Sequence, residues 1–436
     1  MEKSLELSPE KRYHFPEDLA KIFYAGRVII VSPSTANWIV LKEGQEDFFN
    51  LLTQFTIEEA LERYNGSLDD AMDVLVQVEA RALESLITNP ASEFSCQFNI
   101  TNGCNLRCPH CFMNAGRPME NELTTDEIKS FIEKLPSCGI SQISFSGGEI
   151  TMRKDLIEIV EFAHSLNLKI DLLTNGVCWS DAMIARVAPI VNAVQISVDG
   201  YDEEENSKVR GADSFVKSLA TLDKFIRSGV TARLAITPMP TSDLQNKKAS
   251  YVAFAQKIRE RYSEYPLRIV FTTGFMDGRE IKLSDDQRKK YQEIMNGITS
   301  EYLGEDARDY PFILFSRKRL IMDNCGYGGL YVSANGDVKM CNKDFVVPVA
   351  NIRVNTFKEI IRFSEEARRL SNINSIEPCR KCPVRYICGG GCRVDEFPEL
   401  KNGNFADNIT PRRDCSQEHK AEIYDLMIRT NESIFQ

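Results

Sequence analysis

Three cysteines stand close together in the stretch "NGCNLRCPHCFMNAG": Cys104, Cys108 and Cys111. A tetrahedral zinc site or a fully ligated iron–sulfur cube needs four protein ligands. Three thiolates can instead hold three irons of a [4Fe–4S] cube and leave its fourth iron without a protein ligand. An open metal position is typical of a reactive site, so the loop predicts chemistry at this iron. The loop alone leaves a zinc knuckle, or a chance grouping of cysteines, as the alternative.

Polar residues also follow three later strands of the predicted fold. Glycines let a backbone approach a ligand closely, and a carboxylate suits an ammonium group. In barrel-like folds, chemistry lies at the C-terminal ends of the strands. The candidates are Gly147, Gly148 and Glu149 in "ISFSGGE", Thr174 and Asn175 in "TNG", Ser197 in "SVDG", and Arg210 in "SKVRG".

The CxxxCxxC loop, with Phe112 after its third cysteine, and the Gly-Gly-Glu strand end resemble the radical S-adenosylmethionine (SAM) enzymes. The resemblance implies that the amino and carboxylate groups of SAM chelate the unique iron. One electron then cleaves SAM and yields a 5′-deoxyadenosyl radical. It further implies that Gly147, Gly148 and Glu149 bind the SAM amino group. The "TNG" and "SVDG" motifs would lie near the ribose and carboxylate, with Ser197 at the ribose and Arg210 at the carboxylate; an ordinary loop role is the alternative for these last two residues.

A second group of seven cysteines lies in the last third of the chain. Its spacing resembles the SPASM domain, the C-terminal extension of many peptide-modifying radical SAM enzymes, whereas a zinc ribbon has no use for seven thiolates. The resemblance implies two auxiliary [4Fe–4S] clusters, and therefore three clusters in all. The outer one would be held by Cys379, Cys382, Cys388 and Cys415, and the inner one, a ligand short, by Cys325, Cys341 and Cys392.

Three cysteines remain outside these groups: Cys96, Cys138 and Cys178. They lie in or beside predicted strands, or at the end of a predicted helix. We expect all three to be small buried residues. The alternative is that Cys96 supplies a further cluster ligand.

Strand-like and helix-like segments alternate from Phe94 to about Gly278. Such alternation predicts a parallel sheet in an α/β fold, here a partial (β/α)6 barrel of the TIM type. The rhythm stops near residue 310, where the cysteine-rich segment begins. We therefore predict three domains: residues 1–90, a radical SAM core at 91–309, and a SPASM domain at 310–436.

Residues 1–90 show three short β-like runs followed by three helical patterns, which predicts a winged-helix-like α+β domain. Its helices are acidic, which disfavours binding to DNA phosphates. In front of a radical SAM core the domain resembles the RiPP recognition element, a PqqD-like domain that binds the leader of a ribosomally made precursor peptide. Such domains add the leader as a strand to a sheet edge, and "NWIVL", residues 37–41, is the candidate edge.

Composition narrows the class of protein further. The net charge of −10 argues against a general affinity for nucleic acid. No apolar run is long enough to span a membrane, and the first residues lack the apolar core of a secretory signal. Thirteen cysteines in such a chain favour metal ligands in a reducing compartment, so we expect a cytoplasmic protein.

These resemblances cover nearly the whole chain and imply an enzyme that cross-links a precursor peptide. A carbon–carbon bond, as in the lysine–tryptophan link of streptide-type maturases, is the favoured product. A thioether bond of the sactipeptide type is the alternative. A sulfatase-type maturase and a non-catalytic iron–sulfur electron carrier are further alternatives. A cellular one-electron donor, flavodoxin or ferredoxin, is the second expected partner.

Overall fold

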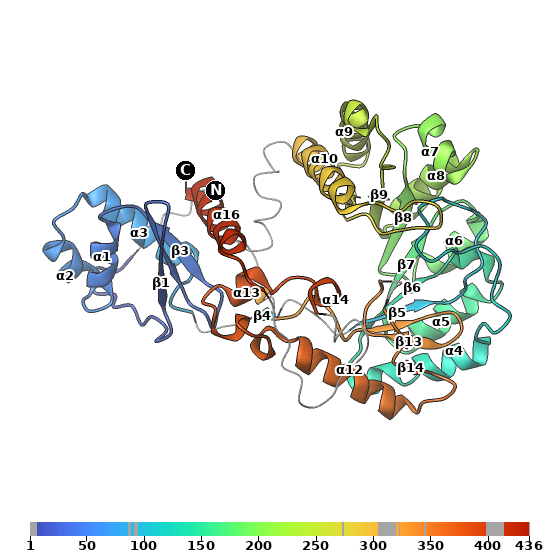
Figure 1. Cartoon of the computed structure of the whole chain (residues 1–436), viewed down its shortest axis with the longest axis horizontal. Helices are drawn as coiled ribbons and strands as arrows, with labels where there is room; N and C mark the ends of the chain where they lie inside the picture. Colours follow the sequence, from blue (N-terminus) through green and yellow to red (C-terminus); the bar gives the residue numbers. More distant parts are fainter. Residues whose placement is uncertain are drawn as a thin grey trace.

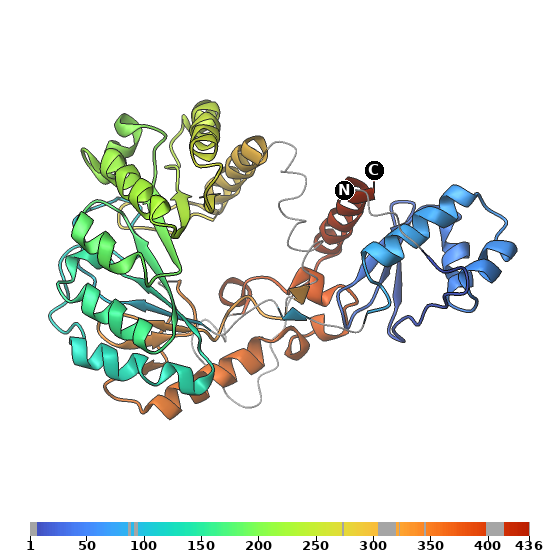
Figure 2. The ribbon, with the colours of Figure 1, turned by 180° about the vertical axis from the view of Figure 1, so that it is seen from behind.

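The computed structural model describes residues 7–85, 89–90, 95–272, 274–303, 320–321, 323–343, 346–397 and 414–435. A small N-terminal domain lies at one end of the molecule and a larger α/β unit at the other (Figure 1). Helices of the cysteine-rich segment lie between them, as the view from behind also shows (Figure 2).

The N-terminal domain has an antiparallel sheet in the order β1-β2-β3, followed by three helices. A two-residue turn at Ala25 and Gly26, both with positive φ, joins the first two strands in a tight hairpin. The predicted order of three strands and three helices is confirmed. The last helix ends at Ala80, and the chain turns at Ala82 with a φ of 42°. The elements are β1 (Ala20–Tyr24), β2 (Arg27–Val31), β3 (Trp38–Leu41), α1 (Gln45–Leu52), α2 (Ile57–Arg63) and α3 (Leu68–Ala80).

The two faces of this small sheet have different partners. Because alternate residues of a strand point to opposite faces, one set of side chains packs on α1, α2 and α3: Val28, Ile30, Ile39 and Leu41. The other set packs on the C-terminal part of the chain: Ile29, Val31, Trp38 and Val40. The sheet is therefore covered on both faces.

The larger unit contains six parallel strands in the order β10-β9-β8-β7-β6-β5, which confirms the six predicted strands and fits a partial barrel. The strands are β5 (Ser95–Asn99), β6 (Gln142–Ser146), β7 (Lys169–Thr174), β8 (Ala193–Val198), β9 (Thr231–Ile236) and β10 (Leu267–Phe271). The helices are α4 (Thr125–Ile132), α5 (Leu156–Ser165), α6 (Asp181–Val187), α7 (Glu203–Arg210), α8 (Ser214–Arg227), α9 (Leu244–Arg261) and α10 (Asp285–Leu303).

Alternation along the strands separates the core from the site. In β6, Ile143 and Phe145 are fully buried in the main hydrophobic core. Ser146 of the same strand is only partly buried and lines a cavity, as do Gln97 of β5 and Gln195 of β8. The inner face of the barrel is thus the polar face, which suits a bound polar ligand.

The barrel sheet continues into the cysteine-rich segment, across the predicted boundary near residue 310. Strand β12 (Leu330–Val332) pairs in parallel with β5, and β13 (Asp337–Lys339) and β14 (Ala350–Asn351) follow it in the sheet. A separate two-stranded sheet joins β4 (Asn89–Pro90) to β11 (Leu320–Ile321). The remaining helices are α12 (Phe357–Ser371), α13 (Arg385–Cys388), α14 (Arg393–Glu396) and α16 (Gln417–Phe435).

Candidate active site

A cavity of about 390 Å³ lies at the C-terminal ends of the barrel strands. Almost all residues predicted to bind the first cluster or SAM line it, although the segments that carry them are far apart in the sequence. They are Cys104, Cys108, Cys111, Phe112, Gly147, Gly148, Thr174, Asn175, Ser197 and Arg210. Of the residues predicted for this site, Glu149 is the exception.

The three-cysteine loop is held by its own backbone. The Cys104 amide donates to the carbonyl of Gly116 at 2.8 Å, and the Cys111 amide donates to the carbonyl of Cys108 at 3.2 Å. Backbone amides also point at two sulfurs, because the Leu106 amide lies 3.4 Å from Cys104 Sγ and the Ala115 amide lies 3.4 Å from Cys111 Sγ. Such amides favour thiolate over thiol.

Burial opposes the thiolate form. It raises the pKa of Cys104 to about 11, with a further contribution from Glu149 and the neighbouring cysteines. It also raises the pKa of Cys108, against the effect of the nearby Arg210 guanidinium. A cation must therefore displace the protons from these sulfurs, as iron does when it binds thiolates. The donor set of three clustered thiols fits a site-differentiated iron–sulfur cluster.

The two glycines of the β6 end allow the strand to pass against the cysteine loop. A Cβ on Gly147, whose φ is +149°, would lie 2.4 Å from the carbonyl oxygen of Thr101. A Cβ on Gly148 would lie 2.4 Å from the carbonyl oxygen of Gly103. The amides of Gly148 and Glu149 donate to these same two carbonyls at 2.8 Å. Glycine is required here because the backbones approach so closely.

Glu149 lies behind the cavity wall, whereas we expected its carboxylate to face SAM. The side chain is buried, and its oxygens accept hydrogen bonds from Thr174 Oγ1 at 2.6 Å and from the Asn175 amide at 2.7 Å. Asn175 Nδ2 in turn donates to Asn105 Oδ1 at 2.9 Å, which ties the end of β7 to the cysteine loop. Glu149 is thus placed to position two cavity residues.

Arg210 also has a partner within the chain. Its Nε lies 2.6 Å from Asp199 Oδ2, and both side chains are largely buried. Burial is the largest single effect on the pKa of Arg210, and it lowers that pKa. The charges of Asp199 and the neighbouring cysteines act in the opposite direction and together outweigh burial, so the pKa of Arg210 is raised. The guanidinium lines the cavity as a fixed positive charge, so it is available to a carboxylate ligand while it remains paired with Asp199.

Sequence reasoning missed two members of this group. His110 lines the cavity between the second and third cysteines, with Nε2 at 3.4 Å from Asp199 Oδ2. Burial lowers the pKa of His110. Asp199 belongs to the "SVDG" motif, so the motif could have pointed to it. Its contacts with His110 and Arg210 could not be deduced from the motif.

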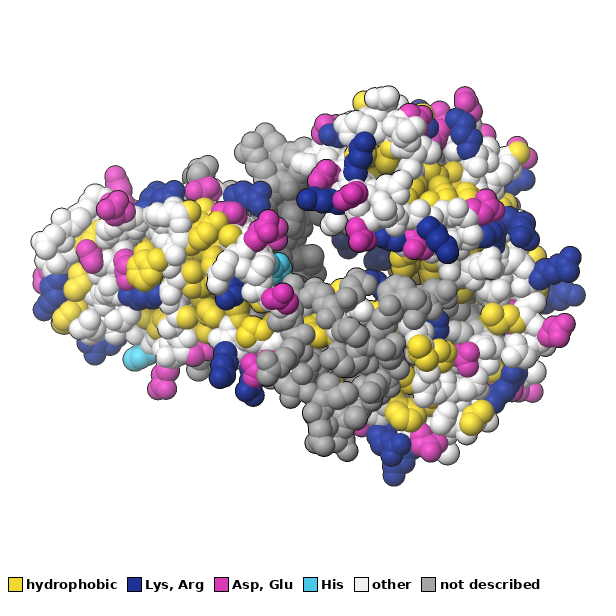
Figure 3. Space-filling model, in the orientation of Figure 1, with side chains coloured by type: hydrophobic (Ala, Val, Ile, Leu, Met, Phe, Trp, Pro, Cys, Tyr) yellow, Lys and Arg dark blue, Asp and Glu magenta, His cyan; other side chains and the backbone are white. Residues whose placement is uncertain are grey.

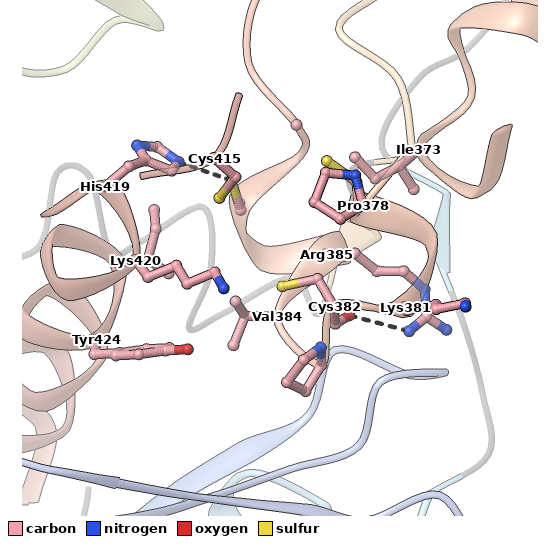
Figure 4. Close-up of a pocket in the computed structure, with 15 residues that line it drawn as sticks. Ile373, Pro378, Lys381, Cys382, Val384, Arg385, Cys415, His419, Lys420 and Tyr424 are labelled. Carbon is pink, nitrogen blue, oxygen red and sulfur yellow. Dashed lines mark hydrogen bonds between the residues drawn. The ribbon is translucent and has the colours of Figure 1, made fainter. Parts of the chain in front are cut away.

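A second cavity, of about 240 Å³, collects the four predicted outer cysteines, Cys379, Cys382, Cys388 and Cys415 (Figure 4). The sequence did not predict His419, whose Nε2 lies 3.2 Å from Cys388 Sγ. Basic residues Lys381, Arg385 and Lys420 line the same cavity. They would offset the negative charge of four thiolates around a cluster.

The predicted inner cysteines also lie near one another. Burial raises the pKa of Cys341, and the charges of Cys325 and Cys392 add to this effect. Cys341 lines a third cavity, of about 390 Å³, that shares four residues with the barrel cavity: Gln97, Phe112, Met113 and Asn342. Lys343 Nζ lies 3.4 Å from Cys392 Sγ. The inner group therefore borders the space next to the three-cysteine loop.

The three remaining cysteines differ in burial. Cys96 is buried in the main core, as expected, and Cys138 is partly buried against that core. Cys178 is exposed, contrary to our expectation, because it follows the last turn of the "TNG" loop rather than a strand.

Two further properties of the described residues bear on the class of site. In that part of the chain, no three Cys, His, Asp or Glu side chains converge closely enough to hold a single metal ion. No described helix is long and apolar enough to cross a membrane.

The comparison with family models agrees with this site. The radical SAM superfamily matches residues 98–246, and SPASM, an iron–sulfur cluster-binding domain, matches residues 324–383. The mycofactocin maturase MftC of Mycobacterium ulcerans is 34% identical over 316 residues, which are 69% of this chain and 83% of MftC. The chain belongs to the radical SAM superfamily and is a radical SAM enzyme with a SPASM domain.

Other relatives include a further maturation protein and a heme synthase. The sporulation killing factor maturation protein SkfB of Bacillus subtilis is 31% identical over 144 residues, 33% of this chain and 35% of SkfB. An AdoMet-dependent heme synthase of Oleidesulfovibrio alaskensis is 27% identical over 328 residues, 69% of this chain and 82% of the synthase. The solved structure of anSMEcpe with bound AdoMet has a TM-score of 0.54 at 17% identity and covers 79% of this chain and 98% of its own. This last likeness shows the shared fold.

Proposed function

We propose that this enzyme matures a ribosomally synthesised precursor peptide by installing an intramolecular cross-link. The observation that carries the proposal is the barrel cavity, where three thiols, a glycine-lined wall and a fixed guanidinium meet beside a second polar space. Three [4Fe–4S] clusters and SAM would be its cofactors. When bound, the first cluster and SAM supply one-electron cleavage of SAM and a carbon radical that abstracts hydrogen.

The residues of the chain have distinct tasks in this proposal. Gly147 and Gly148 bring backbone groups to the cavity wall, where a SAM amino group can be bound. Glu149 holds Thr174 and Asn175 in place, and Arg210 provides the positive charge for the SAM carboxylate. Ser197 and Phe112 complete the wall near the ribose and the cluster.

The neighbouring third cavity supports a polypeptide substrate. Its lining includes five side-chain amides, each of which can donate and accept hydrogen bonds as a peptide backbone does: Gln97, Asn99, Asn102, Asn335 and Asn342. Because this cavity shares residues with the barrel cavity, a core peptide bound in it would lie next to the reacting centre.

We infer a carbon–carbon bond, with lysine and tryptophan as the joined residues. Formation of this bond removes two hydrogens from the peptide. One hydrogen would leave in 5′-deoxyadenosine, and the other would leave as a proton, with an auxiliary cluster held by the C-terminal cysteines as the acceptor for its electron. A thioether is the second candidate. The inner group has three assigned cysteines, so one iron of its cluster could bind a substrate cysteine, and Cys341 lines the cavity proposed for the peptide.

The N-terminal domain is the proposed site for the leader peptide, although the predicted edge is closed. In β3, the Val40 amide donates to Gln77 Oε1 at 3.0 Å, and the Val40 carbonyl accepts from Asn431 Nδ2 at 3.4 Å. Among the described strands, the opposite edge, β1, pairs with β2 alone, and Phe23 on it is 71% exposed. Figure 3 shows hydrophobic side chains on the surface of this domain. We therefore assign leader binding by strand addition to β1.

Other partners follow from the cofactors. Flavodoxin or ferredoxin is the proposed one-electron donor, and a reducing cytoplasm would keep the cluster thiols from forming disulfides. Positive and negative side chains are interspersed on the face shown in Figure 3, which does not favour nucleic acid.

The test uses the peptides encoded by short reading frames beside the gene, incubated with reconstituted enzyme, SAM and dithionite. A product lighter by two hydrogens, with all its cysteines still open to iodoacetamide, would support the carbon–carbon bond. The same mass loss with one thiol blocked would support the thioether. Tandem mass spectrometry would locate the bond. Deoxyadenosine formation without any modified peptide would contradict the proposal.

A further inference from the structure

The walls of the outer cysteine cavity also form the support under the N-terminal sheet. One wall is the segment from Cys379 to Cys388, which carries Val384 and Ile387. The other wall is Cys415 together with α16, which begins two residues later at Gln417 and carries Met427. These three apolar side chains are at most 3% exposed, and they pack on the sheet face made by Ile29, Val31, Trp38 and Val40. In Figure 4, strands of the N-terminal domain pass directly below the cavity.

Helix α16 adds polar and aromatic contacts to this support. Asn431 Nδ2 donates to the Val40 carbonyl, and Arg27 Nη2 lies 3.3 Å from Glu432 Oε1. The rings of Tyr24 and Tyr424 lie 5.4 Å apart, and Tyr424 also lines the outer cavity. The position of α16 therefore decides whether the N-terminal sheet has its support.

The two walls meet in the apolar cluster that they share with the sheet, through Val384 and Ile387 on one side and Met427 on the other. Across the cavity itself, a hydrogen bond joins His419 Nε2 and Cys388 Sγ. The space between the walls measures about 240 Å³, so apolar packing does not fill it. Three cysteines come from the first wall, and the fourth, Cys415, comes from the second.

We propose that the outer cysteine site is a structural staple for the N-terminal domain. A cluster bound there would fix the segment from Cys379 to Cys388 against the start of α16, and so hold together the two-part support of the sheet. The inference rests on the proposed iron–sulfur occupancy of this site. It gives the outer site a task separate from electron transfer.

The inner cysteines provide a matched comparison. Cys325, Cys341 and Cys392 are absent from the described residues that pack on this face of the N-terminal sheet. Cys341 instead borders the substrate space next to the barrel. Loss of iron from the inner site should therefore leave the N-terminal sheet unaffected.

The experiment compares full-length C415S and C341S with the wild-type chain after anaerobic reconstitution. Iron content per chain tests whether each site binds a cluster. Hydrogen–deuterium exchange of peptides covering residues 27–41 tests the staple. We expect both variants to lose iron, and only C415S to exchange about tenfold or more faster in residues 27–41. Exchange in β6 to β8 should stay at the wild-type level in both variants.

Three results would count against the inference, and they are distinguishable. Unchanged exchange in a C415S protein that has lost iron overturns the staple. Equal acceleration in C341S overturns it too, since the effect would not belong to the outer site. Wild-type iron content in C415S overturns instead the proposed occupancy. If C415S does not fold, the wild-type protein is used instead. Exchange in residues 27–41 is then compared between the reconstituted protein and the same protein after a chelator has removed its iron.

Discussion

The barrel cavity and the outer cavity both gather cysteines, but they gather them in different ways. The barrel cavity takes three from one loop and surrounds them with glycines and polar strand ends. The outer cavity takes four from two segments and surrounds them with Pro378, Pro383, Val384 and other apolar side chains. In the proposed account, the first site would leave a position open to a ligand, whereas the second would be fully ligated and borders the N-terminal sheet. A reactive site and a structural site can therefore use the same ligand type, and they differ in the number of cysteines and in the side chains around them.

The largest effect in this comparison is expected at the wall of the barrel cavity. In E149Q, an amide nitrogen replaces one of the oxygens that accept from Thr174 and the Asn175 amide. An unsatisfied buried group costs about 1–3 kcal/mol, so SAM cleavage should fall about tenfold to a hundredfold. Deoxyadenosine release under dithionite measures it, and E161Q, on the outer side of α5, is the matched control. Wild-type release by E149Q would remove Glu149 from the account.

Next in size is the contact between the β6 end and the cysteine loop. In G148A, the added methyl would meet the carbonyl oxygen of Gly103, and the loop must shift. We expect a loss of about 1–3 kcal/mol of stability together with iron from the first cluster. In the same loop, G116A is the control, because its added methyl would lie 3.7 Å from the mobile end of Arg107. Equal iron content and melting temperature in both variants would contradict the steric argument.

At the outer cavity, the expected effect is a smaller, electronic one. With a cluster bound, Cys388 would be a thiolate, and an N–H at His419 Nε2 would stabilise the more negative, reduced form of the cluster. We expect H419L to shift the midpoint potential of the outer cluster to more negative values. Redox titration followed by electron paramagnetic resonance, in a chain without the other two cysteine groups, measures it. E422Q is the control, because it removes the charge of the carboxylate beside His419 and leaves the imidazole in place. An unchanged midpoint potential in H419L would contradict a role for the hydrogen bond.

The smallest effect is expected outside both cavities. Arg353 pairs with Glu127 on α4 at 2.6 Å and lowers the pKa of that carboxyl to about 2. Because the folded-state pKa is depressed, the pair stabilises the protein above the ordinary glutamate pKa, and this contribution is lost as pH falls toward 2. R353M should therefore lower the melting temperature slightly at pH 7, and the difference should shrink in acid. A difference that grows in acid would be the wrong sign.

The sequence predicted the parts of these sites that depend on local spacing. The CxxxCxxC loop and the strand ends are local patterns, and the fold brings them together at the barrel cavity. The four outer cysteines, a set that the family resemblance implies, line one cavity although Cys415 lies on a separate segment. The order of strands and helices in the N-terminal domain followed from periodicity in the same way.

Contacts between distant segments escaped prediction. Val40 was assigned to an open edge because nothing near it in sequence covers it, yet Asn431 does so from 391 positions away. The pairing of Arg210 with Asp199 depends on how α7 packs beside the end of β8. His110 was overlooked because a histidine between two ligands carries no periodic signal. Such contacts depend on tertiary packing, which no short window of sequence contains.

The most direct test of the account compares the two cavities by their chemistry. One variant replaces Cys104, Cys108 and Cys111 by alanine, and the other is C415S. Both are reconstituted with iron and sulfide and supplied with SAM and dithionite, and 5′-deoxyadenosine is measured. The account predicts no release from the triple variant, which should still bind iron at the C-terminal cysteines, and continued release from C415S. Undiminished release from the triple variant would contradict the central claim.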